Sequence, residues 1–114
     1  YGHLPQVGFC WDVGHEACFT PGREYMPLFG KHLIALHIQD NMCEYTKDLH
    51  LIPFDGMINF YHVGEQIKAS GFTGTLMLEV LQKNSNVYDD YTVEQYYERA
   101  FRAVSKLRRI VDGE

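Results

Sequence analysis

The sequence predicts an α/β protein in which a parallel sheet is covered by helices. Three short, mainly apolar segments have the character of strands, and they alternate with segments of helical periodicity. Near-continuous apolar strands of this kind are typical of parallel sheets that are buried on both faces. Each strand also carries an ionisable side chain where it ends. Parallel α/β folds place their chemistry at the C-terminal ends of the strands, so function is expected at that edge.

The three strands are predicted over residues 7–11, 32–38 and 75–80. The first is a short apolar run that stops at Asp12. The second reads HLIALHI and stops at a polar Gln-Asp-Asn sequence. The third is apolar until Glu79. Their lengths suit strands better than helices, because apolar runs of 4–8 residues are typical of buried strands.

The intervals between the strands are predicted to hold loops and two helices. A loop containing Gly14 and the pair Pro21-Gly22 follows the first strand, and a short helix is expected at about 24–31. A long polar loop follows the second strand. The next helix, at about 61–70, ends at Gly71, because glycine readily adopts the left-handed conformation that terminates helices.

The last helix has the clearest signal in the chain. It is predicted to start near Thr92, since Thr92 followed by Gln95 forms a capping box. Apolar side chains then recur at helical spacing. They are Val93, Tyr96, Tyr97, Ala100, Phe101, Val104, Leu107 and Val111.

Composition is that of an ordinary soluble chain of 114 residues, with 46% apolar and 22% charged residues. The net charge of −5 means that the chain has no excess of positive charge with which to bind nucleic acid or an anionic membrane. No apolar run approaches the roughly 20 residues of a membrane span, and the opening residues lack a signal-peptide pattern. Three cysteines without a CxxC pair suit a reducing compartment. We therefore expect a cytoplasmic protein, with Cys10 in the core and Cys18 and Cys43 as accessible thiols.

The three strand ends offer a candidate metal site formed by Asp12, His37 and Glu79. Two carboxylates and an imidazole suit divalent Mn, Mg, Co, Fe or Zn, and do not suit a soft thiolate metal. One ligand from each strand is what convergence on a single point would require. A lone strand-end carboxylate is more often a helix cap or an ion-pair partner. The residues alone therefore leave a metal site and a structural role open.

Further polar side chains are expected at the same edge. His15 follows Asp12 by three residues, and Asp48 and His50 lie two apart in KDLHLIPFDG. An extended backbone would turn Asp48 and His50 to one face, where they could bind a second metal or substrate, or form only a surface hydrogen bond. Residues 39–41 (Gln-Asp-Asn) are candidates for orienting the metal ligands, although a turn after a strand needs such residues anyway.

Four segments in this order resemble a known superfamily: WDVGH, the strand ending HIQDN, the run DLHLIPFDGMINF, and LEV at the end of the third strand. They look like the closing third of the xylose-isomerase-like TIM barrels. That superfamily holds sugar and sugar-phosphate isomerases and epimerases, inosose dehydratases and endonuclease IV. The resemblance covers essentially the whole chain. It implies that residues 1–114 are the C-terminal part of a (β/α)8 barrel, about three βα units from strand six to helix eight. The absence of an initial Met also favours a piece of something longer.

The resemblance also implies roles for individual residues. It makes three of them ligands of one divalent metal (Mn, Mg, Co or Zn), namely Asp12, His37 and Glu79. A fourth ligand, a Glu from an earlier strand, has no counterpart here. In the epimerases the Glu matched by Glu79 also serves as one of two acid–base carboxylates. His15 resembles the histidine that hydrogen-bonds the substrate oxygen, and with Asp48 and His50 it matches the trio that holds an additional zinc in endonuclease IV.

The implied function is a metal-dependent sugar or sugar-phosphate isomerase or epimerase that transfers a proton next to a carbonyl. Its expected partners are a small-molecule sugar and either a second copy of the chain or the missing part of the barrel, with no nucleic acid and no membrane. The isolated chain is expected to have little activity. One alternative is an endonuclease IV-like DNA repair nuclease, which the pair Asp48 and His50 favours and the scarcity of basic residues disfavours. Another is a non-catalytic, self-associating fragment, because three βα units leave strand edges unpaired.

Overall fold

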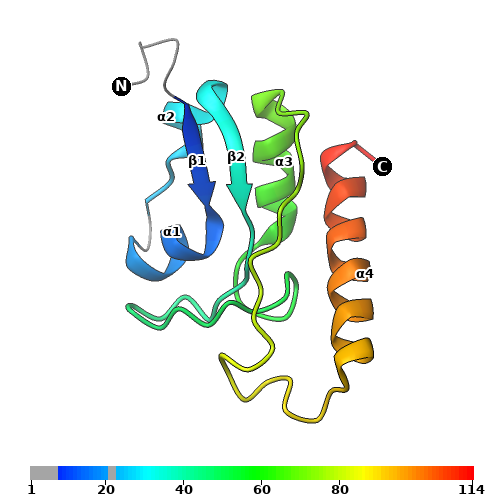
Figure 1. Ribbon diagram of the computed structural model, residues 1–114. Coiled ribbons are helices and arrows are strands. Elements are labelled where there is room, and N and C mark those ends of the chain that lie inside the picture. Colours follow the sequence, from blue (N-terminus) through cyan, green and yellow to red (C-terminus); the bar gives the residue numbers. More distant parts are fainter. Residues whose placement is uncertain (1–7, 21–22) are drawn as a thin grey trace.

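The structure is a computed structural model and describes residues 8–20 and 23–114. Its elements follow in the order β1 (Phe9–Asp12), α1 (Val13–Phe19), α2 (Met26–Phe29), the 3₁₀ helix η1 (Gly30–His32), β2 (Leu33–His37), α3 (Phe60–Ser70) and α4 (Val93–Val111). The two strands lie side by side, and α4 packs along α3 on the β2 side of the sheet (Figure 1). The predicted α/β class is confirmed, with α2 and η1 in place of the single helix expected at 24–31.

The two strands pair in parallel, as their apolar sequences predicted. Their register sets Asp12 opposite His37, with one irregularity between Phe9 and Cys10. The predicted start of the first strand at Val7 lies outside the described residues. Because both strands end at the Asp12–His37 pair, a carboxylate and an imidazole leave the sheet side by side at its C-terminal edge.

The third predicted strand, at 75–80, is not a strand in the structure. Among the described residues this segment forms a single parallel bridge, between Ile38 and Leu78. It is framed by hydrogen bonds from the Ile38 N–H to the Met77 carbonyl (2.9 Å) and from the Glu79 N–H to the Ile38 carbonyl (2.8 Å). The chain then leaves the sheet, since the Leu81 N–H donates to the His50 carbonyl in the long loop. The parallel direction was correct, but the pairing is too short to make a third strand.

Helix α1 occupies a segment where the sequence indicated a loop. Asp12 caps this helix, accepting a hydrogen bond from the backbone N–H of His15 at 2.9 Å. Asp is one of the best N-cap residues, because its carboxylate satisfies an N–H that has no partner within the helix. Gly14, which suggested a turn, lies inside the helix, while Pro21-Gly22 lies outside the described residues.

Helices α3 and α4 confirm their sequence signals. α3 ends at Gly71, which has a φ of 78°, and α4 begins at Thr92 with the complete capping box to Gln95. The main core lies between the sheet and these helices. It is formed by Trp11, Val13, Met26, Leu33, Leu36, Ile38, Phe60, Val63, Ile67, Leu76, Leu107 and Val111. A second core under the loops contains Leu51, Ile52, Tyr88, Tyr96, Ala100 and Ala103.

The cysteines are placed differently from the expectation. Cys10 is exposed rather than in the core, and Cys18 is fully buried rather than accessible, while Cys43 is exposed as expected. Along β1 the side chains alternate, so the neighbour Trp11 takes the inward position. Among the described residues, no helix is long and apolar enough to span a membrane.

Candidate metal centre

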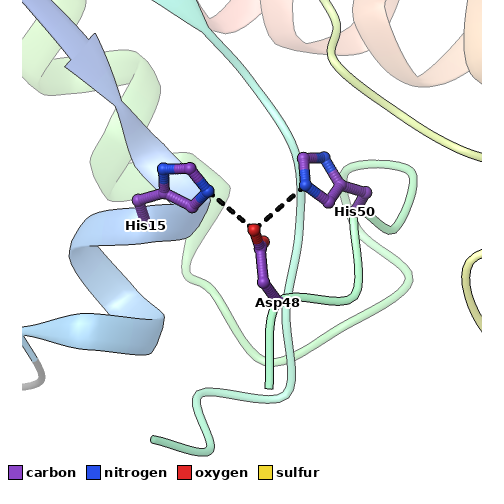
Figure 2. Close-up of side chains that lie close together, drawn as sticks. All are labelled: His15, Asp48 and His50. Atoms are coloured by element: carbon purple, nitrogen blue, oxygen red, sulfur yellow. Dashed lines mark hydrogen bonds and ion pairs between the residues drawn. The ribbon is translucent and has the colours of Figure 1, made fainter. Parts of the chain in front are cut away.

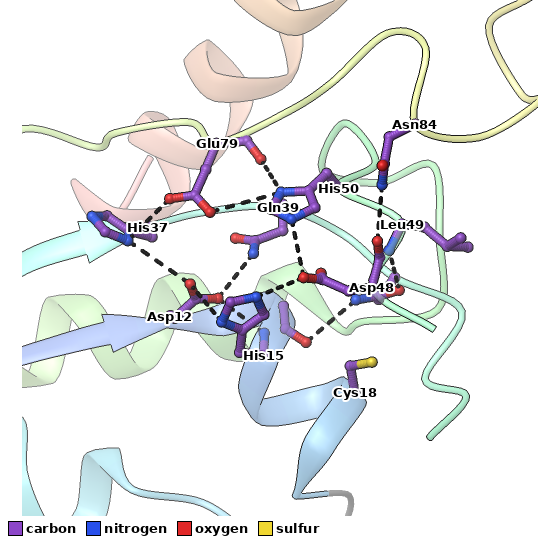
Figure 3. Close-up of polar contacts among 12 residues, drawn as sticks. Asp12, His15, Cys18, His37, Gln39, Asp48, Leu49, His50, Glu79 and Asn84 are labelled. Atoms are coloured by element: carbon purple, nitrogen blue, oxygen red, sulfur yellow. Dashed lines mark hydrogen bonds and ion pairs between the residues drawn. The ribbon is translucent and has the colours of Figure 1, made fainter. Parts of the chain in front are cut away.

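The C-terminal edge of the sheet brings together the strand-end triad, which we define as Asp12, His37 and Glu79 (Figure 3). Asp12 and His37 end β1 and β2, and Glu79 follows the bridge at Leu78. Nδ1 of His37 lies 3.1 Å from Oε2 of Glu79 and 3.8 Å from Oδ2 of Asp12. One candidate ligand atom from each of the three lies within 4.8 Å of the others.

Beside it lies the loop triad, which we define as His15, Asp48 and His50. The Asp48 carboxylate points between the two imidazoles (Figure 2). Its Oδ2 is 2.6 Å from Nε2 of His15 and 3.1 Å from Nε2 of His50. His15 comes from the first half of α1, whereas Asp48 and His50 come from the long loop after β2. His50 has a φ of 52°, in the left-handed region that few non-glycine residues occupy.

The two triads are joined by direct contacts. Nδ1 of His15 lies 3.1 Å from Oδ2 of Asp12. Nδ1 of His50 lies 2.7 Å from the backbone carbonyl oxygen of Glu79 and 3.8 Å from its Oε1. Each loop-triad histidine therefore has one ring nitrogen toward Asp48 and the other toward a residue of the strand-end triad. All six candidate residues from the sequence thus gather at one edge. A substitution in one triad is expected to change the side-chain geometry of the other.

The long loop is held in place by two fully buried residues, Asp40 and Asn41. Asp40 accepts hydrogen bonds from the backbone N–H groups of Gly56 (2.7 Å), Asn41 (2.7 Å) and Ile58 (3.1 Å). Burial raises the pKa of the Asp40 carboxyl above its usual range, although these donors oppose the shift. Asn41 accepts from the Leu49 N–H at 3.1 Å. These two residues therefore position the loop that carries Asp48 and His50, instead of contacting a metal ligand themselves.

Gln39 is the member of residues 39–41 that touches a candidate ligand. Its side chain is fully buried, and its Nε2 donates to Oδ1 of Asp12 at 2.9 Å. From the sequence, Gln39 could be recognised only as one of three polar residues that follow the second strand. Its contact depends on where α1 runs, so the missed helix also concealed this interaction.

The strand-end triad fits a divalent cation in donor type and in spacing. Ligand atoms that share an ion at roughly 2.0–2.2 Å lie about 3–4 Å apart, and the distances from Nδ1 of His37 to its two carboxylate neighbours are 3.1 and 3.8 Å. The site is also open on one side, since the side chains of His37 and Glu79 are 45% and 38% exposed. Further ligands or a substrate can approach from there.

The loop triad also fits a cation in donor type and spacing. Nε2 of His15 and Nε2 of His50 face the same carboxylate oxygen, Oδ2 of Asp48. One candidate ligand atom from each of the three residues lies within 4.8 Å of the others. Two imidazoles and a carboxylate form a set that suits zinc.

The two triads together contain carboxylates and imidazoles and no Lys or Arg. Lys47, in the loop that carries Asp48, is paired with Glu44, with Nζ 2.7 Å from Oε2. The hydrogen bond and the charge of Glu44 raise the pKa of the Lys47 ammonium above its usual range. Lys83 follows Glu79 in the segment that leaves the sheet. The edge is therefore predominantly acidic and imidazole-rich, which favours cations over a phosphate backbone.

Comparison with known proteins assigns a family. Residues 2–107 match the family described as "Xylose isomerase-like TIM barrel". The chain is also 33% identical over 108 residues to the uncharacterized protein y4fM of Sinorhizobium fredii (strain NBRC 101917 / NGR234), covering 92% of this chain and 32% of that protein. It thus spans about a third of the length of this curated relative. No solved structure matches significantly. With the match extending over nearly its full length, the chain belongs to the xylose isomerase-like TIM barrel family.

Proposed function

We propose that this chain carries the metal-binding edge of a divalent-metal-dependent sugar or sugar-phosphate isomerase or epimerase. The observation that carries the proposal is the convergence of Asp12, His37 and Glu79 from three successive parallel segments, with ligand atoms within 4.8 Å of one another. Family membership supports an enzyme of this general kind. The family also includes nucleases, so the choice of a sugar rests on the acidic edge and the net charge of −5.

The residues of the chain have separate tasks in this reaction. A divalent cation bound to the strand-end triad would supply Lewis acidity to a sugar carbonyl and its neighbouring hydroxyl. Glu79 exchanges a proton with the carbon next to that carbonyl, through the carboxylate oxygen that is not used for binding. His15 hydrogen-bonds a substrate oxygen through Nδ1, while Asp48 accepts a hydrogen bond from Nε2 and so fixes the orientation of the ring. General acid–base catalysis of this kind contributes about 10²–10⁴-fold.

We propose further that the chain corresponds to the C-terminal part of the barrel. Large apolar side chains remain uncovered on the sheet and on α4, such as Ile34 (67% exposed) and Phe101 (70% exposed). Apolar surface of this extent normally packs against another part of a protein. The length of the curated relative supports a larger whole, in which further strands would continue the sheet and supply the fourth ligand.

The loop triad favours a second candidate, a metal-dependent nuclease related to endonuclease IV. His15, Asp48 and His50 are arranged for a second cation, which a phosphodiesterase uses to stabilise both the attacking and the leaving oxygen. Against this candidate stand the acidic charge and the engagement of Lys47 by Glu44, because a protein that grips duplex DNA relies on free cations.

The experiment uses the complete natural protein loaded with Mn²⁺ and incubated with a panel of ketoses and ketose phosphates in deuterated water. Wild-type protein is expected to incorporate deuterium next to the carbonyl of one of them. Glu79→Gln should reduce incorporation at least 100-fold, because the amide cannot exchange the proton. Glu65→Gln, an exposed carboxylate on α3, is the matched control and should behave as wild type.

Two outcomes would refute the proposal. The first is incorporation by Glu79→Gln at near the wild-type rate, which removes Glu79 from the proton transfer. The second is cleavage of a duplex containing an abasic site together with no exchange on any sugar, which selects the nuclease. Absence of both activities in the metal-loaded, folded protein would favour a non-catalytic role.

A further inference from the structure

We propose that Gln39 is a positioning residue of the strand-end triad: it fixes the Asp12 carboxylate so that Oδ1 is held by the protein and Oδ2 is left for the cation. The inference rests on the proposed function, since it assigns a purpose to the remaining Asp12 oxygen. It goes beyond that function because the ligand set alone does not say what holds Asp12 in place or which of its oxygens binds.

The two oxygens of Asp12 have different surroundings. Oδ1 accepts hydrogen bonds from the backbone N–H of His15 and from Nε2 of Gln39, both at 2.9 Å. Oδ2 faces ring nitrogens instead, with Nδ1 of His15 at 3.1 Å and Nδ1 of His37 at 3.8 Å. Two donors occupy the two lone-pair directions of Oδ1. Oδ2 is therefore the oxygen with coordination capacity left, and Asp12 meets the cation through one oxygen.

Gln39 is built into this position by the sequence around it. Its side chain is fully buried and lies between the two triads (Figure 3). It packs directly on Gly14 of α1, where an added Cβ would lie 2.5 Å from Cγ and 2.8 Å from Nε2 of Gln39. Only glycine leaves room for the Gln39 amide to pass over α1 and reach Asp12. The glycine and the glutamine thus act as a pair.

The orientation of the amide is determined by Asp12. Oε1 of Gln39 is buried and has no hydrogen-bond partner among the described residues. Turning the amide over would set Oε1 against Oδ1 of Asp12 and bring two acceptors together, so the observed orientation is the favourable one. A buried acceptor without a donor is still unfavourable. A side chain present for packing alone would be more stable if it were apolar, so the contact with Asp12 is the feature that accounts for a glutamine here.

The test compares cation affinity with stability in the complete natural protein. Gln39→Met keeps the length of the side chain but removes both the Asp12 contact and the unpartnered oxygen. The dissociation constant for Co²⁺ is expected to rise 10- to 100-fold, as for other residues that orient metal ligands, and the visible absorption of bound Co²⁺ should change. The melting temperature of the metal-free protein should stay the same or rise. All titrations are repeated in the Asp48→Asn background, so that the loop triad does not contribute a second site.

Two glycine substitutions form the matched control. Gly14→Ala should displace Gln39 and weaken Co²⁺ binding without removing any polar group. Gly64→Ala, on α3, introduces a comparable clash, with the added Cβ 2.4 Å from Cγ2 of Ile110 and far along the chain from the triads. It should lower stability and leave the Co²⁺ affinity and spectrum of the folded protein unchanged.

The possible failures can be told apart. If wild-type protein does not bind Co²⁺, the proposed function is wrong at its metal site and the positioning role falls with it. If wild-type protein binds Co²⁺ and Gln39→Met binds it equally well, only the positioning role is refuted. It is refuted as well if Gln39→Met lowers the metal-free melting temperature and leaves the Co²⁺ spectrum unchanged, because Gln39 is then purely structural. Should Gln39→Met fail to fold, Gly14→Ala decides by the same criteria.

Discussion

The buried carboxylate of Asp40 gives the sharpest test of how the long loop is held. In Asp40→Asn the oxygen Oδ1 is retained for the N–H groups of Asn41 and Ile58, but an NH₂ group replaces Oδ2 and faces the Gly56 N–H. Gly56 is packed closely against the backbone of Asn41, since an added Cβ at Gly56 would lie 2.5 Å from the carbonyl oxygen of Asn41. The variant therefore loses the hydrogen bond from the Gly56 N–H to Oδ2 and brings two donors together.

The magnitude follows from this geometry. A buried donor without a partner costs about 1–3 kcal/mol. The Gly56 N–H is such a donor in the variant, so we expect Asp40→Asn to destabilise the loop by about 1–3 kcal/mol. At roughly 1.4 kcal/mol for each factor of ten, that corresponds to about 5- to 150-fold faster hydrogen exchange at Gly56 and Ile58.

The pH dependence adds an independent check. Burial raises the pKa of Asp40 in the folded protein above its ordinary value of 3.8. The folded state then holds this proton more tightly than the unfolded state, so the contribution of Asp40 to stability is largest at acid pH and is lost as pH rises through the folded pKa. Asp40→Asn does not titrate. The difference in unfolding free energy between wild type and variant should therefore be greatest below about pH 4 and become smaller toward neutrality.

The measurements are hydrogen exchange by mass spectrometry and urea unfolding from pH 3 to pH 8, with Asp89→Asn as an exposed control. Unchanged exchange at Gly56 and Ile58 would show that Asp40 does not hold the loop. A stability difference that increases with pH would contradict the raised pKa.

Two further substitutions test the packing around the site. Tyr88→Phe removes the hydroxyl that accepts the Ile52 N–H at 2.8 Å and donates to Oδ2 of Asp55 at 2.7 Å. It should lower the free energy of unfolding in urea by about 1–3 kcal/mol. The control Tyr97→Phe, at an exposed residue, should change that free energy by less than about 0.5 kcal/mol. Equal changes in the two variants would mean that the Tyr88 hydroxyl is solvated. Gly71→Ala should lower the free energy of thermal unfolding by about 1 kcal/mol, because the φ of residue 71 is 78°. Nothing lies within 4 Å of the added Cβ, so this variant tests the backbone conformation alone. An unaltered melting temperature would show that the end of α3 relaxes.

Helices α3 and α4 could be predicted because their signals are local. The capping box of Thr92 and Gln95 and the stop at Gly71 depend on neighbours within one turn, and both are present in the structure. The third strand could not be predicted correctly, because strand formation depends on partners elsewhere in the chain. Among the described residues, Leu78 is the one residue of that segment that forms a β-bridge, and a single bridge does not make a strand.

The predicted burial of Cys10 and exposure of Cys18 were wrong for a related reason. A run such as Phe-Cys-Trp at 9–11 is apolar throughout, so nothing in it says which side chain points inward. The structure turns Trp11 inward and Cys10 outward. Cys18 became buried because it lies on α1, the helix that the sequence did not indicate. Its Sγ donates to the Glu44 carbonyl at 3.4 Å, a contact between segments that are distant in sequence.

The positions of Asp12 and His37 were predictable because each ends a parallel strand, and the two lie opposite each other in the register. Glu79 lies beside His37 although it follows an isolated bridge and not a strand. The residues that support them were not predictable in the same way. Gln39, Asp40 and Asn41 are all polar and consecutive, yet one holds Asp12 and the other two hold the loop. Those roles depend on the path of α1 and of the loop, which the sequence left open.

Asp12 also shows that the structural and the functional interpretation of a strand-end carboxylate do not exclude each other. Its Oδ1 caps α1 through the His15 N–H, which is the ordinary role of an aspartate at a helix start. A carboxylate has a second oxygen, and here Oδ2 faces the imidazoles of His15 and His37. Capping fixes the rotation of the carboxylate and so directs Oδ2 toward the triad. The helix cap that argued against a metal ligand in the sequence is therefore, in the structure, part of what would make Asp12 a good one.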